Sequence, residues 1–180
     1  MRSMFAALFL AAVPAQIAHA QEFAALTGRL APGRCHMDYC AFFSIERAEQ
    51  VGQTPHGALY RLETKWFNSY HPHGYDKPAP RKFDGDQIGY VFCSKTKPAL
   101  LDQNDDKTTW RVGFLALGNT QQVFGANETG LALYWAACHR AIVSDVYGEG
   151  EKLGGKLGYH IDKPAEDIEK LADPKTALTW

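Results

Sequence analysis

Two histidines stand two residues apart in the sequence His71-Pro72-His73, and Asp76 follows three residues after the second. Imidazole nitrogens and carboxylate oxygens are common metal ligands, and an extended His-x-His segment can direct both rings at one ion. His71, His73 and Asp76 are therefore a candidate metal site; the alternative is a loop of solvated histidines without a metal. A further histidine ligand would have to come from His36, His56, His139 or His160.

Aromatic residues surround this histidine pair at unusual density. Exposed aromatic rings give a large contact area at a low cost in side-chain entropy, which suits a binding surface. We therefore predict a binding surface made of Trp66, Tyr70, His71, His73 and Tyr75. The alternative is that Trp66 belongs to the core and that the tyrosines only hold the loop in place.

The run Asp102, Asn104 and Asp106 resembles the start of a calcium-binding loop. Such a loop needs glycine at its sixth position and an acidic residue at its twelfth, where this chain has Lys107 and Gly113. A polar hairpin turn is therefore the preferred interpretation.

Motifs for other enzyme chemistry are weak. The segment from Gly148 to Gly155 lacks the spacing of a phosphate-binding loop and is interpreted as a flexible connection, and no G-x-S-x-G motif is present. An acid and base pair would require the fold to bring separated carboxylates together. The carboxylates considered for such a pair are Glu63, Asp84, Asp86 and Asp102.

The first residues have the pattern of an export signal. Arg2 provides a positive start, an apolar run follows, and Ala18-His19-Ala20 matches a signal-peptidase site. We therefore expect residues 1–20 to be removed and the mature chain to reside in the periplasm or to be secreted, with no membrane span after the signal. Loss of Arg2 changes the formal charge from −1 to −2, and this near-neutral balance argues against a nucleic-acid partner.

Four cysteines occur in the chain, and an even number in an exported protein indicates disulfides. Cys138 lies on the apolar stripe of a predicted helix and Cys93 in an apolar strand, which favours pairing Cys93 with Cys138 and Cys35 with Cys40. The alternative, in which Cys35 or Cys40 is linked to the helix, stays open at the level of sequence.

The clearest helical pattern covers residues 128–142, where Leu131, Tyr134, Trp135 and Cys138 form one apolar stripe. A second, short amphipathic helix is expected from Pro164 to Ala172. Alternating or apolar segments predict strands, with a long loop over residues 68–86 that holds three prolines. The expected strands cover residues 39–46, 58–67, 88–94, 98–101, 109–117 and, less regularly, 121–124.

These elements predict one disulfide-bonded α+β domain over residues 21–180: an antiparallel sheet of about five or six strands packed on one central helix, plus the short C-terminal helix. The predicted disulfides and the aromatic loop favour an exported binding or inhibitor-like module, with an unknown protein or small ligand as partner and no cofactor. The rival hypothesis is a small periplasmic enzyme, assisted by a metal at His71 and His73.

Overall fold

The computed structural model describes residues 26–118, 127–161 and 165–180. The predicted signal segment and the expected strand at residues 121–124 lie outside these ranges. Within them, no helix is long and apolar enough to cross a membrane.

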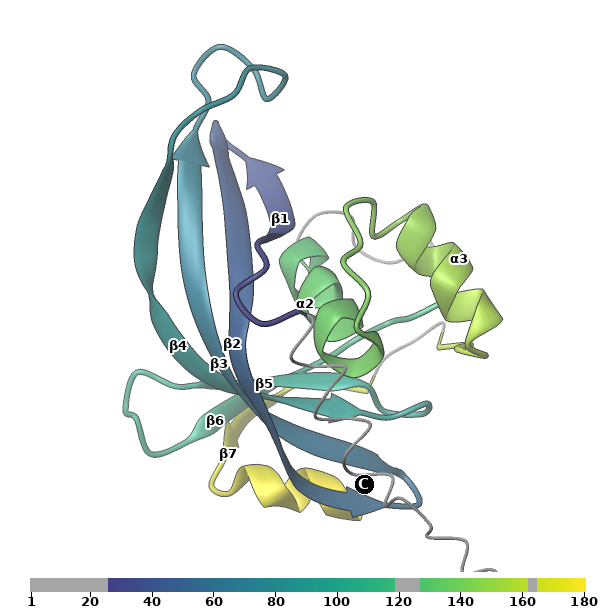
Figure 1. The fold of residues 1–180 in the computed structure, drawn as a ribbon. Coiled ribbons are helices and arrows are strands. Elements are labelled where there is room, and N and C mark those ends of the chain that lie inside the picture. The colour runs from purple at the N-terminus through teal and green to yellow at the C-terminus, as the bar shows by residue number, and fades with distance from the viewer. Residues whose placement is uncertain (1–25, 119–126, 162–164) are drawn as a thin grey trace, which may run out of the picture.

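Seven strands form one antiparallel sheet in which every strand pairs with its neighbour in the chain (Figure 1). Their spatial order is thus the sequence order, β1 to β7. Short hairpin connections suffice for such a meander, because each strand runs back beside the last one. The strands are β1 (Ala31–His36), β2 (Tyr39–Thr54), β3 (Gly57–Tyr70), β4 (Arg81–Cys93), β5 (Ala99–Gln103), β6 (Trp110–Phe114) and β7 (Ile168–Leu171).

The three strands β2, β3 and β4 are much longer than the others and extend beyond the helices at one end of the sheet (Figure 1). The expected loop over residues 68–86 is too long, because β3 continues to Tyr70 and β4 already begins at Arg81. Phe67 pairs with Phe42 on one side and with Phe83 on the other. Such cross-strand aromatic pairs stabilise a sheet, and they continue the ladder into the segment that the prolines suggest is irregular.

One face of the sheet packs on the helix α2 (Glu128–His139), which ends three residues earlier than the predicted helix of residues 128–142. Six consecutive helix residues, 132–137, are buried, so α2 is enclosed nearly all round. Small alanines on the flanks of Tyr134 and Trp135 permit this close approach. The disulfide between Cys93 and Cys138 ties the end of α2 to β4.

The opposite face of the sheet has its own hydrophobic cluster, centred on Leu59, Phe92 and Leu101. The C-terminal 3₁₀ helix η1 (Pro174–Thr179) and the indole of Trp180 cover this cluster. The prediction of a sheet packed on one central helix is therefore wrong. The sheet has seven strands rather than five or six, it is the dominant element, and its two faces are covered by different short helices (Figure 1).

The expected helix from Pro164 to Ala172 is also wrong, because the described part of that segment contains strand β7. Ile168 and Leu171 pack against the second cluster, and they pair with Val112 and Trp110 of β6. An apolar pair three residues apart fits a helix turn by spacing alone. The segment forms a strand instead, because β6 has a free edge for it to pair with and the second hydrophobic cluster lies beside that edge.

The glycine-rich segment interpreted as a loop forms the helix α3 (Glu149–Lys156). Gly150 and Gly154 are buried, and they are four residues apart, hence on the same helix face. A Cβ built at Gly150 would lie 2.9 Å from the Trp135 indole nitrogen, and one at Gly154 would lie 3.4 Å from the indole ring. The glycines therefore serve close packing of α3 on α2, which outweighs their poor helix propensity.

This packing gives a prediction with an internal control. Gly150→Ala places a methyl group against the rigid Trp135 ring, so we expect a loss of about 1 to 3 kcal/mol in the free energy of unfolding. Gly155 is exposed in the same helix, and a methyl group added to it would meet nothing within 4 Å, so Gly155→Ala is expected to stabilise by about 1 kcal/mol through helix propensity. Urea unfolding of both variants measures the difference. Equal effects would show that α3 does not pack on Trp135 in this way.

Candidate functional site

The projecting end of the long strands begins with the tight turn between β1 and β2. Met37 and Asp38 form this turn with φ angles of 48° and 66°, the sign that a two-residue hairpin turn of type I′ requires. The flanking residues Cys35 and Cys40 face each other in the ladder and form a disulfide. Both disulfides thus have the pairing that the sequence favoured, and the turn is fixed covalently.

The loop between β3 and β4, residues 71–80, is held on this turn by two hydrogen bonds. The backbone N–H of His71 donates to the Asp38 carbonyl oxygen at 2.6 Å. The backbone N–H of Asp38 donates to the phenolic oxygen of Tyr75 at 3.1 Å. Two segments that are distant in the sequence therefore form one ordered end of the sheet.

The buried side chain of His71 connects the end of β3 to the β3–β4 loop by hydrogen bonds. It is 8% exposed, and its Nδ1 lies 3.1 Å from the Lys77 carbonyl oxygen while its Nε2 lies 2.6 Å from the Ser69 hydroxyl oxygen. A carbonyl oxygen only accepts, so the neutral ring carries its proton on Nδ1, and Nε2 accepts from Ser69. A metal at Nε2 would have to displace the Ser69 hydroxyl.

The other two predicted metal ligands, His73 and Asp76, are exposed in the same loop. Among the described residues, no group of three or more histidine, cysteine, aspartate or glutamate side chains is arranged to hold a metal ion. The metal site stays a prediction, and the hydrogen bonds of His71 do not favour it.

Large hydrophobic side chains are exposed mainly at this end of the molecule. Six such side chains are exposed among the described residues, and five of them lie on the β1–β2 turn, the β3–β4 loop or the adjoining strand ends. Tyr39 and Tyr70 are cross-strand partners with ring centroids 5.0 Å apart. We call the five side chains the tip surface: Met37 (76% exposed), Tyr39 (53%), Tyr70 (52%), Tyr75 (48%) and Phe83 (56%). Phe83 contacts Phe67, which lies on the opposite face of the sheet from Tyr39 and Tyr70, so the tip surface extends around the end of the sheet.

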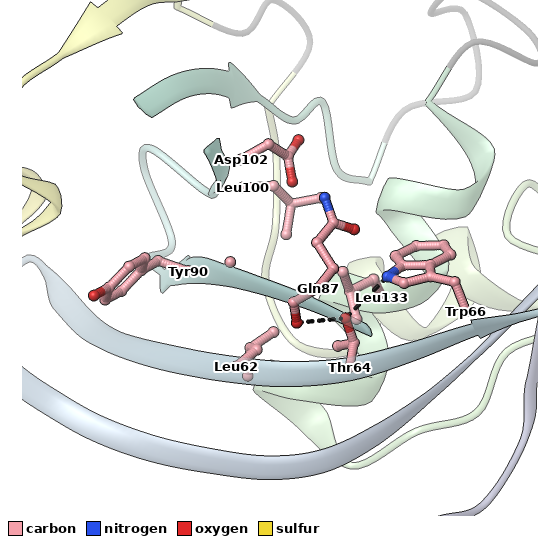
Figure 2. Close-up of a pocket in the computed structure, with 9 residues that line it drawn as sticks. Leu62, Thr64, Trp66, Gln87, Tyr90, Leu100, Asp102 and Leu133 are labelled. Carbon is pink, nitrogen blue, oxygen red and sulfur yellow. Dashed lines mark hydrogen bonds between the residues drawn. The ribbon is translucent and has the colours of Figure 1, made fainter. Parts of the chain in front are cut away.

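Trp66, the remaining residue of the predicted binding surface, lies away from the tip surface. Its ring packs 5.7 Å from that of Phe43, and its indole N–H donates to the Thr64 hydroxyl at 2.9 Å. Figure 2 shows Trp66 beside Leu133 of α2, at the wall of a small cavity. The structure thus brings Tyr70, His71 and Tyr75 together in the loop region and places Trp66 on the helix-covered face.

The cavity in Figure 2 has a volume of about 20 Å³, which is room for one water molecule rather than a substrate. Asp102 is the one acidic residue among the described residues that line it. Desolvation raises the pKa of this carboxyl, and the Arg111 guanidinium 3.9 Å away opposes the shift. Glu63 is instead paired with Arg61 on the opposite face of the sheet. These two candidate carboxylates therefore do not form an acid and base pair.

Asp106 explains why the calcium-like run is a turn. Its carboxylate accepts from the backbone N–H groups of Thr108 and Thr109, at 2.8 and 2.9 Å, and from the Thr109 hydroxyl at 2.7 Å. These hydrogen bonds lower its pKa to about 2. The residue thus closes the β5–β6 hairpin, as the missing glycine and acidic positions indicate.

A buried chain of hydrogen bonds lies beside the Cys93–Cys138 disulfide. The Tyr134 hydroxyl is 3.1 Å from the Ser94 carbonyl oxygen and 3.0 Å from the Tyr159 hydroxyl, which lies 2.8 Å from His139 Nε2. The Ser94 carbonyl oxygen can only accept a hydrogen bond, so the Tyr134 hydroxyl donates to it and must accept from the Tyr159 hydroxyl. Tyr159 has then used its proton, and His139 must donate through Nε2.

The direction of these hydrogen bonds determines whether they can carry a proton away from His139. Burial lowers the pKa of His139 to about 4, with the Lys95 and Arg140 charges adding to the effect, so the ring is neutral near pH 7. The Lys95 ammonium lies 4.0 Å from the centre of the Tyr159 ring and donates to the Leu157 carbonyl oxygen. Because the chain ends on a backbone carbonyl, which cannot take up the proton, its role is to join α2 to the residues around Ser94 and Tyr159.

Sequence reasoning missed Met37, Tyr39 and Phe83 as members of the tip surface. The signal for the first two was the spacing Cys35-x4-Cys40: a disulfide between these residues requires a tight turn in which Met37 and Tyr39 are presented at the end. Phe83 falls within the expected long loop, and only its pairing with Phe67 places it on a strand.

No family model matches the chain, and neither a curated protein nor a solved structure matches it significantly.

Proposed function

We propose that this chain is an exported binding module that docks a protein partner through the tip surface. The observation that carries the proposal is the concentration of exposed large hydrophobic side chains: five of the six among the described residues lie at this one end. Scattered single apolar residues are normal on a protein surface, whereas a cluster of them at one place marks an interaction site.

The tip surface is held in shape before any partner binds. The Cys35–Cys40 disulfide fixes the turn, and the hydrogen bonds from His71 and to Tyr75 fix the loop against it. A surface that is already ordered loses less conformational entropy on association, so more of the contact energy contributes to affinity.

The chemistry of the tip surface favours a protein as the occupant. Its members are three tyrosines, one phenylalanine and one methionine, residue types that are enriched at the centres of protein interfaces.

Export is part of the proposal. The two disulfides are compatible with an oxidising compartment, and the signal-like pattern of residues 1–20 supports a periplasmic or secreted location. The rival enzyme hypothesis relied on a metal at His71 and His73, and both ring nitrogens of His71 already have hydrogen-bond partners in Ser69 and Lys77.

Site-specific photocrosslinking in the exporting cell tests this function. We expect a benzoylphenylalanine at position 75 to give a discrete adduct with one partner protein. The same residue at position 88 should not, although Ile88 is similarly exposed, at 43%, in the middle of β4. The adduct from position 75 should disappear when Tyr39 and Tyr70 are both replaced by alanine.

The mass of the adduct identifies the occupant. An adduct with a different protein supports the proposal. An adduct of two copies of this chain would show instead that the tip surface mediates self-association. Adducts of equal yield from positions 75 and 88, or an adduct that persists in the double variant, would remove the tip surface as the docking site.

A further inference from the structure

A groove with a volume of about 330 Å³ lies next to the tip surface, on the face of the sheet that α2 covers. This volume is in the range of sites for small molecules. The groove is formed by β1, the first residues of β2, the end of β3 and the start of α2, with Tyr39 shared between the groove and the tip surface. Its lining includes Arg34, His36, Tyr39, Ala41, Asn68 and Thr129.

The position of β1 against α2 builds one wall of this groove. The backbone N–H of Arg34 donates to the Thr129 hydroxyl oxygen at 2.9 Å. A Cβ at Gly33 would lie 2.8 Å from the Thr129 methyl group, so glycine at this position permits the approach. The wall is therefore part of the fold and exists without a ligand.

The groove is rich in hydrogen-bond donors. Arg34 has five guanidinium N–H groups, and His36 and Asn68 add further N–H donors. In the part of the chain that the structure describes, these three side chains have no hydrogen-bond or ion-pair partner. Among the residues of the described ranges that line the groove, none is acidic. This excess of donors, which includes the positive charge of Arg34, is complementary to an anion.

Apolar surface lies beside these donors. Tyr39 is half exposed and stacks at a tilt of 37° against Tyr70, and Ala41 follows Tyr39 on the same face of β2. A ligand that satisfies both halves of the lining has a flat or apolar body and a compact anionic group. The planar guanidinium fork matches a carboxylate through two parallel hydrogen bonds.

From this combination we infer that the groove binds an aromatic carboxylate, with the carboxylate on Arg34 and the ring against Tyr39. Such a group occurs in small aromatic acids and at the C-terminus of a peptide that ends in an aromatic residue. The inference does not depend on the protein partner of the tip surface, because only Tyr39 belongs to both.

Titrations followed by backbone amide chemical shifts test this inference on the mature protein with both disulfides intact. The probes are 3-phenylpropionate, N-acetylphenylalanine, the uncharged N-acetylphenylalaninamide and inorganic phosphate. We expect an aromatic carboxylate to shift the amides of Ala41, Asn68 and Thr129 with a Kd on the order of 1 mM. The amide and phosphate should bind at least about tenfold more weakly, because each lacks one half of the match.

Arg34→Gln should weaken carboxylate binding about tenfold. Arg81→Gln removes the same charge on the opposite face of the same end and should leave binding unchanged. Binding of N-acetylphenylalanine alone supports a peptide C-terminus as the source, and equal binding of 3-phenylpropionate supports a small acid. The inference is overturned by an absence of binding, by equal affinities for the carboxylate and its amide, or by equal effects of the two arginine substitutions.

Discussion

Replacing Cys93 and Cys138 by alanine is expected to lower the free energy of unfolding by about 4 kcal/mol. This disulfide closes a loop of 45 residues in the unfolded chain, so removing it restores a large conformational entropy to that state. In the folded protein it joins the last turn of α2 to β4 beside the His139 hydrogen-bond chain. The measurement is urea unfolding of the purified variant at neutral pH.

The second disulfide is the matched control. Cys35 and Cys40 are only five residues apart, and the same loop-closure relation gives a loss of about 2 kcal/mol when both are replaced by alanine. We therefore expect the Cys93 and Cys138 variant to be the less stable of the two. An equal loss in both variants would mean that the entropy of loop closure does not determine how much the Cys93–Cys138 disulfide stabilises the protein.

The second large effect is a dependence of stability on pH. His139 has a folded-state pKa of about 4 against an ordinary value of 6.5, so between these values the unfolded chain binds a proton that the folded protein does not. Stability is thus fully present above pH 6.5 and is lost as the pH falls toward 4. The upper bound of the loss is about 3 kcal/mol, from about 1.4 kcal/mol per pKa unit, and solvent screening of the partly buried ring keeps the loss below this bound.

His139→Gln isolates this contribution from the titration of the carboxylates. A glutamine amide retains an N–H donor for the Tyr159 hydroxyl and does not protonate in this range. Between pH 6.5 and 4, the variant should lose less stability than the original protein, as followed by thermal unfolding at several pH values. Parallel curves for the two proteins would show that His139 is not held neutral by burial and by the Lys95 and Arg140 charges.

The sequence was sufficient for features that depend on local pattern. The alternation of Tyr60, Leu62 and Thr64 predicted a strand, and these residues are buried in β3 as expected. The stripe through Tyr134 and Trp135 predicted a buried helix, which α2 is. Periodicity is a property of neighbouring residues, so it can be evaluated without knowledge of the partner elements.

Features that depend on distant partners could not be predicted in the same way. Gly150 and Gly154 are poor helix formers, and only the Trp135 ring packed against them accounts for α3. Ile168 and Leu171 join the sheet because β6 offers a free edge. The two clusters on opposite faces of the sheet are likewise set by its twist and pairing, which is why a single central helix was the wrong expectation.

The candidate site likewise combines features that the local sequence predicts with features that depend on distant residues. Tyr70 and Tyr75 were predicted from the aromatic density around the loop, and both are exposed at the tip surface. The burial of His71 depends on Ser69 and Lys77, and the presence of Tyr39 beside Tyr70 depends on strand register. The composition of a loop indicates that a surface exists, whereas its members are fixed by the elements on either side.

The most direct test of the proposed function uses the partner protein that the crosslinking identifies, purified in free form. Its affinity is measured for three forms of this protein. Calorimetric titration should give a Kd at least about 100-fold weaker for the variant with Tyr39→Ala and Tyr70→Ala than for the original protein, the loss expected for two central aromatic anchors. Ile88→Ala, on the exposed middle of β4, should leave the Kd unchanged. Equal affinity of all three forms would contradict the tip surface as the docking site.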